Sequence, residues 1–155
     1  MKVAVYSGNI PSTTFIENLI KGLEKSGIEV FLFGKKKGNV SYGKNVKVYP
    51  TPSGQIALMF FIFQQSLKLI LKDAGKFSKA FSLIKKKNKS TGAILKNMGM
   101  ILPVLNHKHD IFHIQWAKTV YQNPELFELL ESKIILSLRG AHINYSPLTD
   151  DKLAN

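Results

Sequence analysis

Hydrophobic residues along the first third of the chain switch between the spacing of a strand and that of a helix. Three short runs have the length and the apolar or alternating pattern of strands: 2–7, 28–33 and 45–49. Over 16–23 apolar residues recur every three or four positions, and Gly27 marks the end of this predicted helix. Thr14 and Glu17 have the spacing of a capping box at its start, and the third strand is expected to stop before Pro50. The order strand–loop–helix–strand opens a doubly wound sheet.

Residues 55–106 are predicted to be mostly helical. The first part, 56–71, is apolar nearly all round at its start, which indicates a helix that is buried on several sides or lies partly against an apolar partner. Its longest unbroken apolar run, 56–63, is too short to span a bilayer. Two further stripes follow at helical spacing: Phe77, Ala80, Phe81 and Ile84, and then Ile94, Met98, Ile101 and Leu105.

The last third has the pattern of a βαβ unit. Strand-length runs at 110–115 and 133–138 flank a helix predicted at 124–131, with Asn123 as N-cap and Pro124 as its first residue. Strands joined in this way lie parallel, and ligands gather at the carboxyl ends of parallel strands. Polar residues occur at both of these ends: His113, Gln115, Trp116, Arg139, His142 and Asn144. We expect the two groups to border one site.

Two loops are candidate binding sites. The loop at 8–13 precedes a helix N-terminus, which suits a phosphate or a sugar hydroxyl, although a plain tight turn fits equally well. Only Gly8 is a glycine there, so the dinucleotide fingerprint G-x-G-x-x-G is missing, which argues against an NAD or FAD enzyme. His107 and His109 have no carboxylate or thiol partner in the pattern, so a solvated turn is expected there and not a metal site.

The composition of the chain excludes several classes of protein. The chain of 155 residues has the size of one domain and contains no cysteine, so it has neither a disulfide framework nor a thiolate metal site. The N-terminus lacks the apolar core of a signal peptide, which favours a cytoplasmic location. The formal net charge is +12, and Arg139 is the only arginine among 22 lysines and arginines. Lysine favours loose attraction to an anionic surface over sequence reading, although its abundance can also mirror genome composition.

Several segments in order resemble the N-terminal half of the retaining group-1 (family-four) glycosyltransferases, which have the GT-B fold. Residues 27–30 (GIEV) match the family's G-h-E-V after the first helix, where h is hydrophobic. Residues 110–115 (DIFHIQ) are similar to its D-h-h-H-h-H strand, and 138–143 (LRGAHI) to its h-R-G-x-x-h segment. Two positions depart from the pattern, because Gln115 and Arg139 stand where the family often has histidine.

The resemblance implies a Rossmann-like three-layer α/β sandwich with a mostly parallel sheet. Residues 1–155 would form the acceptor-side domain of a GT-B architecture. The C-terminal nucleotide-sugar domain is expected outside this sequence, because 149–152 resembles a helix start that is cut off. The whole enzyme would move a sugar from a nucleotide-sugar donor to a glycan or glycolipid acceptor in cell-surface polysaccharide synthesis. No metal or other cofactor is expected, and this fragment alone is expected to be inactive.

The resemblance also suggests roles for residues. The expected catalytic residues are Arg139, whose charge would neutralise a phosphate, Gln115, which can hydrogen-bond, and His113, which fits a structural role equally well. The expected substrate-binding residues lie in the loops: Gly8, Asn9, Ser12, Thr13, Trp116, Gly140, His142 and Asn144.

Two other classes of protein fit parts of the sequence, and one surface is a candidate membrane contact. A non-enzymatic flavodoxin-like module fits the alternating pattern, but no aspartate precedes Asp73, so a phosphoacceptor cluster is missing. A nucleic-acid binder fits the net charge but not the near absence of arginine, and no specific nucleic acid is expected. The basic helices could lie on an anionic membrane at the inner face, or could simply have a solvated lysine side. The lysines expected at that surface are Lys68, Lys72, Lys76, Lys79, Lys85, Lys86 and Lys87.

Overall fold

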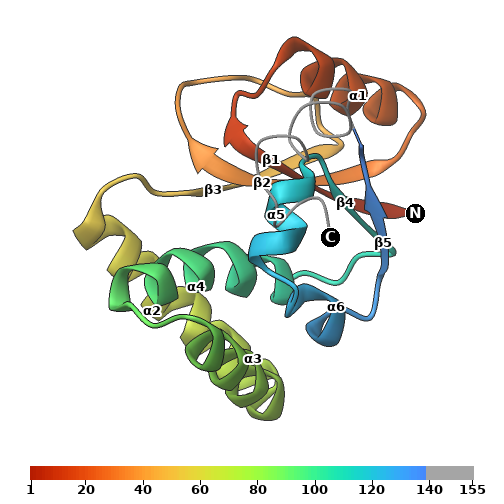
Figure 1. Cartoon of the computed structure of the whole chain (residues 1–155). Helices are drawn as coiled ribbons and strands as arrows, with labels where there is room; N and C mark the ends of the chain where they lie inside the picture. The colour runs from red at the N-terminus through yellow and green to blue at the C-terminus, as the bar shows by residue number, and fades with distance from the viewer. Residues whose placement is uncertain (139–155) are drawn as a thin grey trace, which may run out of the picture.

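A five-stranded, all-parallel sheet with helices on both faces forms the fold (Figure 1), which a computed structural model describes for residues 1–138. The strands are β1 (Lys2–Ile10), β2 (Glu29–Lys36), β3 (Val46–Thr51), β4 (Ile111–Ile114) and β5 (Lys133–Leu136). The helices are α1 (Thr14–Lys25), α2 (Gln55–Lys72), α3 (Ala74–Lys87), α4 (Thr91–Leu105), α5 (Ala117–Gln122) and α6 (Leu126–Leu129). The predicted Rossmann-like α/β class is confirmed.

The order of the strands is β3-β2-β1-β4-β5. The chain moves outward from β1 to β3, and after α2, α3 and α4 it returns to the other side of β1. This is the dinucleotide-binding topology and not the flavodoxin-like order 2-1-3-4-5. The point where the winding reverses lies between β1 and β4, which pair from Val3 with Ile111 to Tyr6 with Ile114. In open α/β sheets, ligands bind at the carboxyl ends of the strands at this point.

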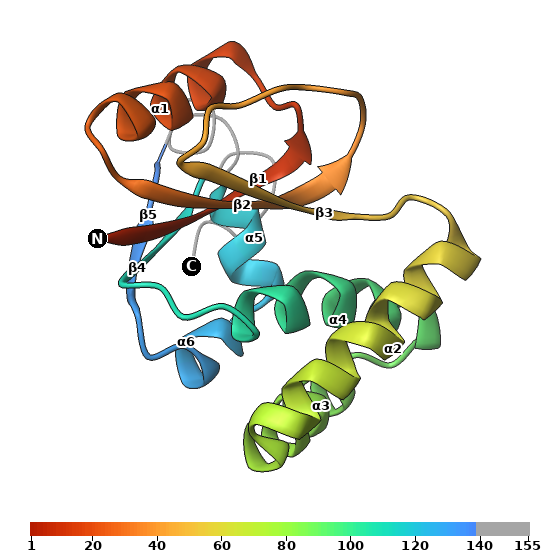
Figure 2. The same ribbon diagram turned by 180° about the vertical axis from the view of Figure 1, so that it is seen from behind.

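Alternate residues of each strand supply two cores. On one face, Val3 and Val5 pack with α1, where Ile16 and Ile20 are fully buried. On the other face, Ala4 belongs to a larger cluster that includes residues of β2, β4 and α4. Figure 2 shows α1 on one side of the sheet and α4 on the other. The apolar runs thus form strands because both sides of the sheet are covered.

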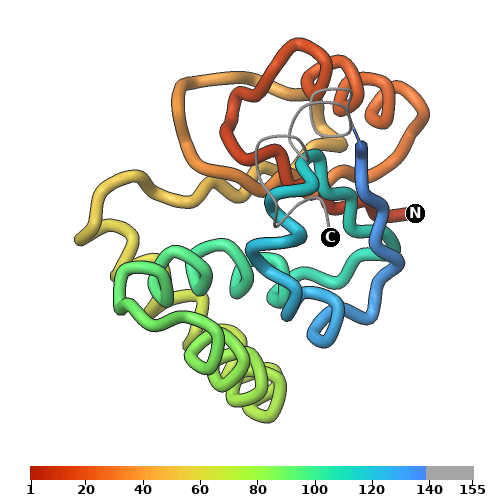
Figure 3. The backbone as a smooth tube through the Cα atoms, in the orientation of Figure 1, coloured from red at the N-terminus to blue at the C-terminus, as the bar shows by residue number. Residues whose placement is uncertain are grey.

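Outside α4, the helices α2 and α3 form a further layer that lies away from the sheet (Figure 3). Leu58 packs against the larger core, and Ile62 and Leu69 of α2 are buried in it. The approach of α2 to α4 is close at Gly99, where an added β-carbon would lie 2.8 Å from Leu58 Cδ1. The prediction that 55–106 is mostly helical is confirmed.

The predicted capping box at the start of α1 is wrong. The helix begins one residue earlier, with Thr13 as N-cap and no side-chain hydrogen bond from it. Glu17 is therefore beyond the capping-box position and reaches back to the loop. Its carboxylate accepts hydrogen bonds from Ser12 N at 2.7 Å and from the Tyr42 hydroxyl at 3.1 Å. Glu17 thus joins the loop after β1 to the loop after β2.

The predicted end of the third strand is also wrong. β3 continues through Pro50, which lies opposite Gly34 of β2, to Thr51. Proline is tolerated there because β3 is at the edge of the sheet and needs no amide donor on its outer side.

The predicted helix at 124–131 is reduced to α6, and α5 forms in what was predicted as a loop. Asn123 does not act as an N-cap. Its amide donates a hydrogen bond to Thr119 O at 2.9 Å and so closes the end of α5.

Candidate functional site

The carboxyl ends of β1 and β4 meet at the reversal point of the sheet. We call Ser7, Gly8, Asn9, Gln115 and Trp116 the switch edge. The pairing of β1 with β2 is irregular between Tyr6 and Gly8, and Gly8 has a φ of 80°, a conformation that glycine adopts readily. A β-carbon on Gly8 would lie 3.6 Å from the Trp116 indole nitrogen, so the indole lies against this irregular part of β1. The end of β1 and the segment after β4, which are far apart in sequence, are thus brought into contact.

Ser7 holds this edge together. It is buried, and the single proton of its hydroxyl is shared between Asn9 O at 2.8 Å and Phe33 O at 3.3 Å. Its own carbonyl accepts hydrogen bonds from Ser12 Oγ at 3.2 Å and from the Trp116 indole at 3.4 Å. Sequence reasoning missed this role, and the only signal for it was a small polar residue directly before Gly8.

The adjoining ends of β4 and β5 carry a second contact. Nε2 of His113 lies 2.8 Å from Ser137 Oγ, and the tautomer of the ring decides which atom donates. Ser137 N also donates to Ile114 O at 2.9 Å, which extends the parallel pairing past the end of β5. Gln115, which follows β4, is fully buried. His113 therefore links two strands, in keeping with a structural role.

The predicted site residues divide into three groups. Gly8, Asn9, Gln115 and Trp116 belong to the switch edge, where Asn9 is exposed, and His113 lies beside it on β4. Ser12 and Thr13 lie in the loop after β1, where Ser12 is half-buried and Thr13 is exposed. The remaining predicted residues lie outside the described part of the chain: Arg139, Gly140, His142 and Asn144.

The switch edge is uncharged, but lysines lie next to it. Lys35 and Lys36 of β2 pair with Asn9 and Ile10 of β1 and are exposed. The edge therefore offers hydroxyl, amide and indole groups beside positive charge. Such a set suits a ligand with hydroxyl groups and a phosphate. Among residues 1–138, no three His, Cys, Asp or Glu side chains are grouped so as to hold a metal ion.

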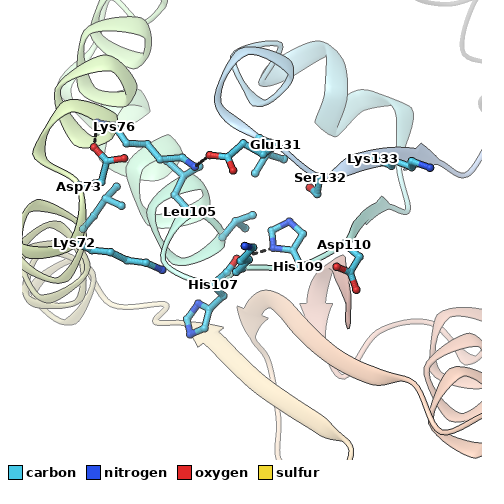
Figure 4. A pocket seen from close by; sticks show the side chains of 14 residues that line it. Lys72, Asp73, Lys76, Leu105, His107, His109, Asp110, Glu131, Ser132 and Lys133 are labelled. Atoms are coloured by element: carbon cyan, nitrogen blue, oxygen red, sulfur yellow. Dashed lines mark hydrogen bonds and ion pairs between the residues drawn. The ribbon is translucent and has the colours of Figure 1, made fainter. Parts of the chain in front are cut away.

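A hollow lies at the opposite, amino-terminal edge of the sheet (Figure 4). It has a volume of about 540 Å³ and lies between α2, α3 and the segments that lead into β4 and β5. Lys76 and Glu131 form an ion pair of 2.9 Å, and Asp73 caps α3 by accepting from Lys76 N at 2.8 Å. Asp110 accepts from Lys2 N at 2.7 Å. The three carboxylates of this hollow, those of Asp73, Asp110 and Glu131, thus have partners in the fold itself, so we take the switch edge as the candidate functional site.

The expectation of a solvated turn at His107 and His109 is wrong. Nδ1 of His107 lies 2.7 Å from Pro103 O, and Nδ1 of His109 lies 2.7 Å from His107 O. The His107 ring packs on Tyr49 with centroids 4.0 Å apart, and His109 is buried. The turn is covered because α4 leads directly into β4 beneath the sheet.

These two histidines predict a pH dependence of stability. Burial lowers the pKa of both His107 and His109 below the ordinary value of 6.5. The unfolded chain therefore takes up protons before the folded chain does, so stability is complete above about pH 6.5 and is lost as the pH falls through the folded pKa values. We expect the urea midpoint to decrease between about pH 7.5 and pH 5.5. The double variant His107→Gln/His109→Gln should show a flatter profile, and an equally steep profile would assign the effect to other groups.

Comparisons with protein-family models, with curated proteins and with solved structures find no significant match to this chain. The class that fold and site define is an α/β protein of Rossmann-like topology with a polar edge at its reversal point.

Proposed function

We propose that the chain is the acceptor-side domain of a retaining GT-B glycosyltransferase. The enzyme would transfer a sugar from a nucleotide-sugar donor to a glycan or lipid-linked acceptor for cell-surface polysaccharide, in the cytoplasm or at the inner face of the membrane. One observation carries the proposal. The end of β1 meets the segment that follows β4, the strand that resembles the family's D-h-h-H-h-H strand, where Gly8 lies against Trp116 at the reversal point of the sheet.

Each part of the switch edge has a role in this proposal. The Trp116 indole offers an apolar surface for a sugar ring, and Asn9 and Thr13 offer exposed polar groups for its hydroxyls. Gln115, which is fully buried, would hold the switch edge in position. Ser7 fixes the loop after β1, because its carbonyl accepts from Ser12. Arg139 would neutralise the leaving phosphate, as the family motif implies. The nucleotide sugar is a substrate, and its second binding lobe would be the C-terminal domain.

The chain offers a direct test because Trp116 is its only tryptophan. Titration with alkyl glycosides, as acceptor mimics, is expected to change the tryptophan emission in a saturable way. Asn9→Ala and Thr13→Ala should each weaken binding by roughly tenfold, the effect of losing one good hydrogen bond. Asn18→Ala and Thr91→Ala are matched controls on exposed positions of α1 and α4 and should bind like the original chain. Absence of any response, or a response to flavin mononucleotide alone, would count against the glycosyltransferase proposal.

A further inference from the structure

Helix α2 has two apolar faces, and only one of them is used in packing. Ile62 and Leu69 are buried against the larger core, with Leu58 half-buried beside them. The opposite side carries exposed apolar residues at helical spacing, which we call the α2 stripe: Ile56, Met59, Phe60, Phe63, Leu67, Ile70 and Leu71. Ile56 is 86% exposed and Phe63 is 64% exposed. Exposed apolar side chains gathered in this way mark an interaction surface.

The α2 stripe is uncovered because α2 lies outside α4. Figures 1 and 2 show α4 between the sheet and α2, with α3 beside α2. Within residues 1–138, therefore, the layers of the fold end at α2 and α3 on this side.

The charge around the α2 stripe is one-sided. From 55 to 105 the sequence has nine lysines and one acidic residue, Asp73, which caps α3. Four of the seven lysines predicted to face a membrane donate hydrogen bonds to groups of the fold: Lys72, Lys76, Lys79 and Lys87. Lys68 of α2 and Lys85 and Lys86 of α3 are exposed, and they make no hydrogen bond or ion pair within the described residues. These three lysines are available to an anionic partner.

By length and composition, α2 could cross a membrane, and only 17% of it is buried within the protein, but its connections oppose a crossing. β3 precedes α2 and α3 follows it directly, and the chain must then return to β4 beside β1. If α2 crossed the membrane, a second helix would have to cross it in the opposite direction to bring the chain back to β4. The helices available, α3 with 14 residues and α4 with 15, are shorter than a bilayer requires. The geometry therefore suits a helix that lies flat in a surface.

We propose that α2 docks on an anionic lipid bilayer, with the α2 stripe inserted among the acyl chains and Lys68, Lys85 and Lys86 at the head groups. Helices that lie in a membrane interface combine an apolar face with basic residues in this way. A second copy of the chain fits less well, because two bodies with a formal charge of +12 repel each other. The proposal does not depend on glycosyltransferase activity.

Vesicle sedimentation of the full chain tests the proposal. We expect binding to vesicles of phosphatidylcholine with phosphatidylglycerol at low salt, and much weaker binding to phosphatidylcholine alone. Phe60→Ser and Phe63→Ser should each weaken partitioning by roughly tenfold, because each removes one inserted ring. Phe127→Ser is the matched control, since Phe127 is 55% exposed on α6, away from α2. Equal binding of all three variants, or no binding of the original chain, would overturn the proposal.

Two variants that remove the same number of positive charges distinguish docking through α2 from a general attraction of the protein to anionic vesicles. The triple variant Lys68→Gln/Lys85→Gln/Lys86→Gln should lose most of the preference for phosphatidylglycerol. Lys21→Gln/Lys25→Gln/Lys44→Gln removes the same charge near α1, on the other face of the sheet, and should retain that preference. Equal losses in both variants would contradict the proposal, because binding would then follow net charge alone.

Because the chain has no cysteine, a single introduced cysteine reports on one position. An environment-sensitive dye on Phe63→Cys should shift its emission to the blue on vesicles, and the same dye on Lys21→Cys should not. A dimer in solution that Phe60→Ser dissolves, without vesicle binding, would instead assign the α2 stripe to self-association and overturn membrane docking.

Discussion

Replacing Lys87 by methionine is expected to lower the free energy of unfolding by about 2–3 kcal/mol. The reason is Glu125, whose carboxylate is 4% exposed and lies 3.4 Å from Lys87 Nζ. The same amine donates to the carbonyls of Gln122 at 2.5 Å and Tyr121 at 3.4 Å, so it joins the end of α3 to the turn after α5. Within the described residues, Glu125 Oε1 has no hydrogen-bond partner. Without Lys87 a buried negative charge loses its cation, and that loss is costly.

Lys86→Met is the matched control, because Lys86 is the preceding residue and is exposed. Its effect on stability should stay within about 0.5 kcal/mol, as for other surface changes. Urea denaturation followed by far-ultraviolet circular dichroism measures both variants, and the double variant Lys87→Met/Glu125→Gln should recover part of the loss. Equal midpoints for Lys87→Met and Lys86→Met would show that the ion pair contributes nothing.

Gly8→Val is expected to destabilise the fold by about 2–3 kcal/mol and to disturb the switch edge at the same time. The backbone of Gly8 has a φ of 80°, which is costly for a β-branched residue. The two methyl groups of valine would also extend toward Trp116, because even a β-carbon would be 3.6 Å from its indole nitrogen. Both effects act at one position beside Trp116, so the emission of this tryptophan should change in the folded variant.

The same substitution at Gly22 is the control. Gly22 lies in α1, where an added β-carbon meets nothing within 4 Å and the backbone is helical. Gly22→Val should therefore be close to neutral, since valine has a slightly higher helix propensity than glycine. If the two variants had the same urea midpoint and the same tryptophan emission, the left-handed turn at Gly8 would not be needed for the edge.

Much of the sheet follows from the sequence, because its strands are covered on both faces and their apolar runs are unmistakable. β1, α1 and β2 lie close to their predicted positions, and the helical middle third is confirmed. The loop predicted at 8–13 is shorter, because β1 continues past 7 and pairs with β2 as far as Ile10. α5 was missed because none of its residues is buried, so no apolar stripe marks it. The Asn123-Pro124 pair then suggested a helix start, whereas Asn123 serves the preceding helix. The sequence pattern was misleading here because the carbonyl that Asn123 bonds, that of Thr119, precedes it in the chain.

The candidate site was predictable only in part. Strand ends indicated Gly8 and Trp116, but their contact depends on β4 lying next to β1, and strand order is not encoded in periodicity. The exposure of Phe60 and Phe63 was equally hidden. A helix that is apolar nearly all round does not reveal which face its neighbours cover, because that depends on α4 standing between it and the sheet.

Pro50 also determines how the sheet ends. Within the described residues β3 forms one margin of the sheet, where the outward amides of the strand could otherwise donate to a strand from another molecule. A residue that carries no amide hydrogen leaves a gap in that row, and a foreign strand laid along it could not complete its ladder. The protein is thereby protected on this side from edge-to-edge aggregation, and extended peptides are poor candidates for association there.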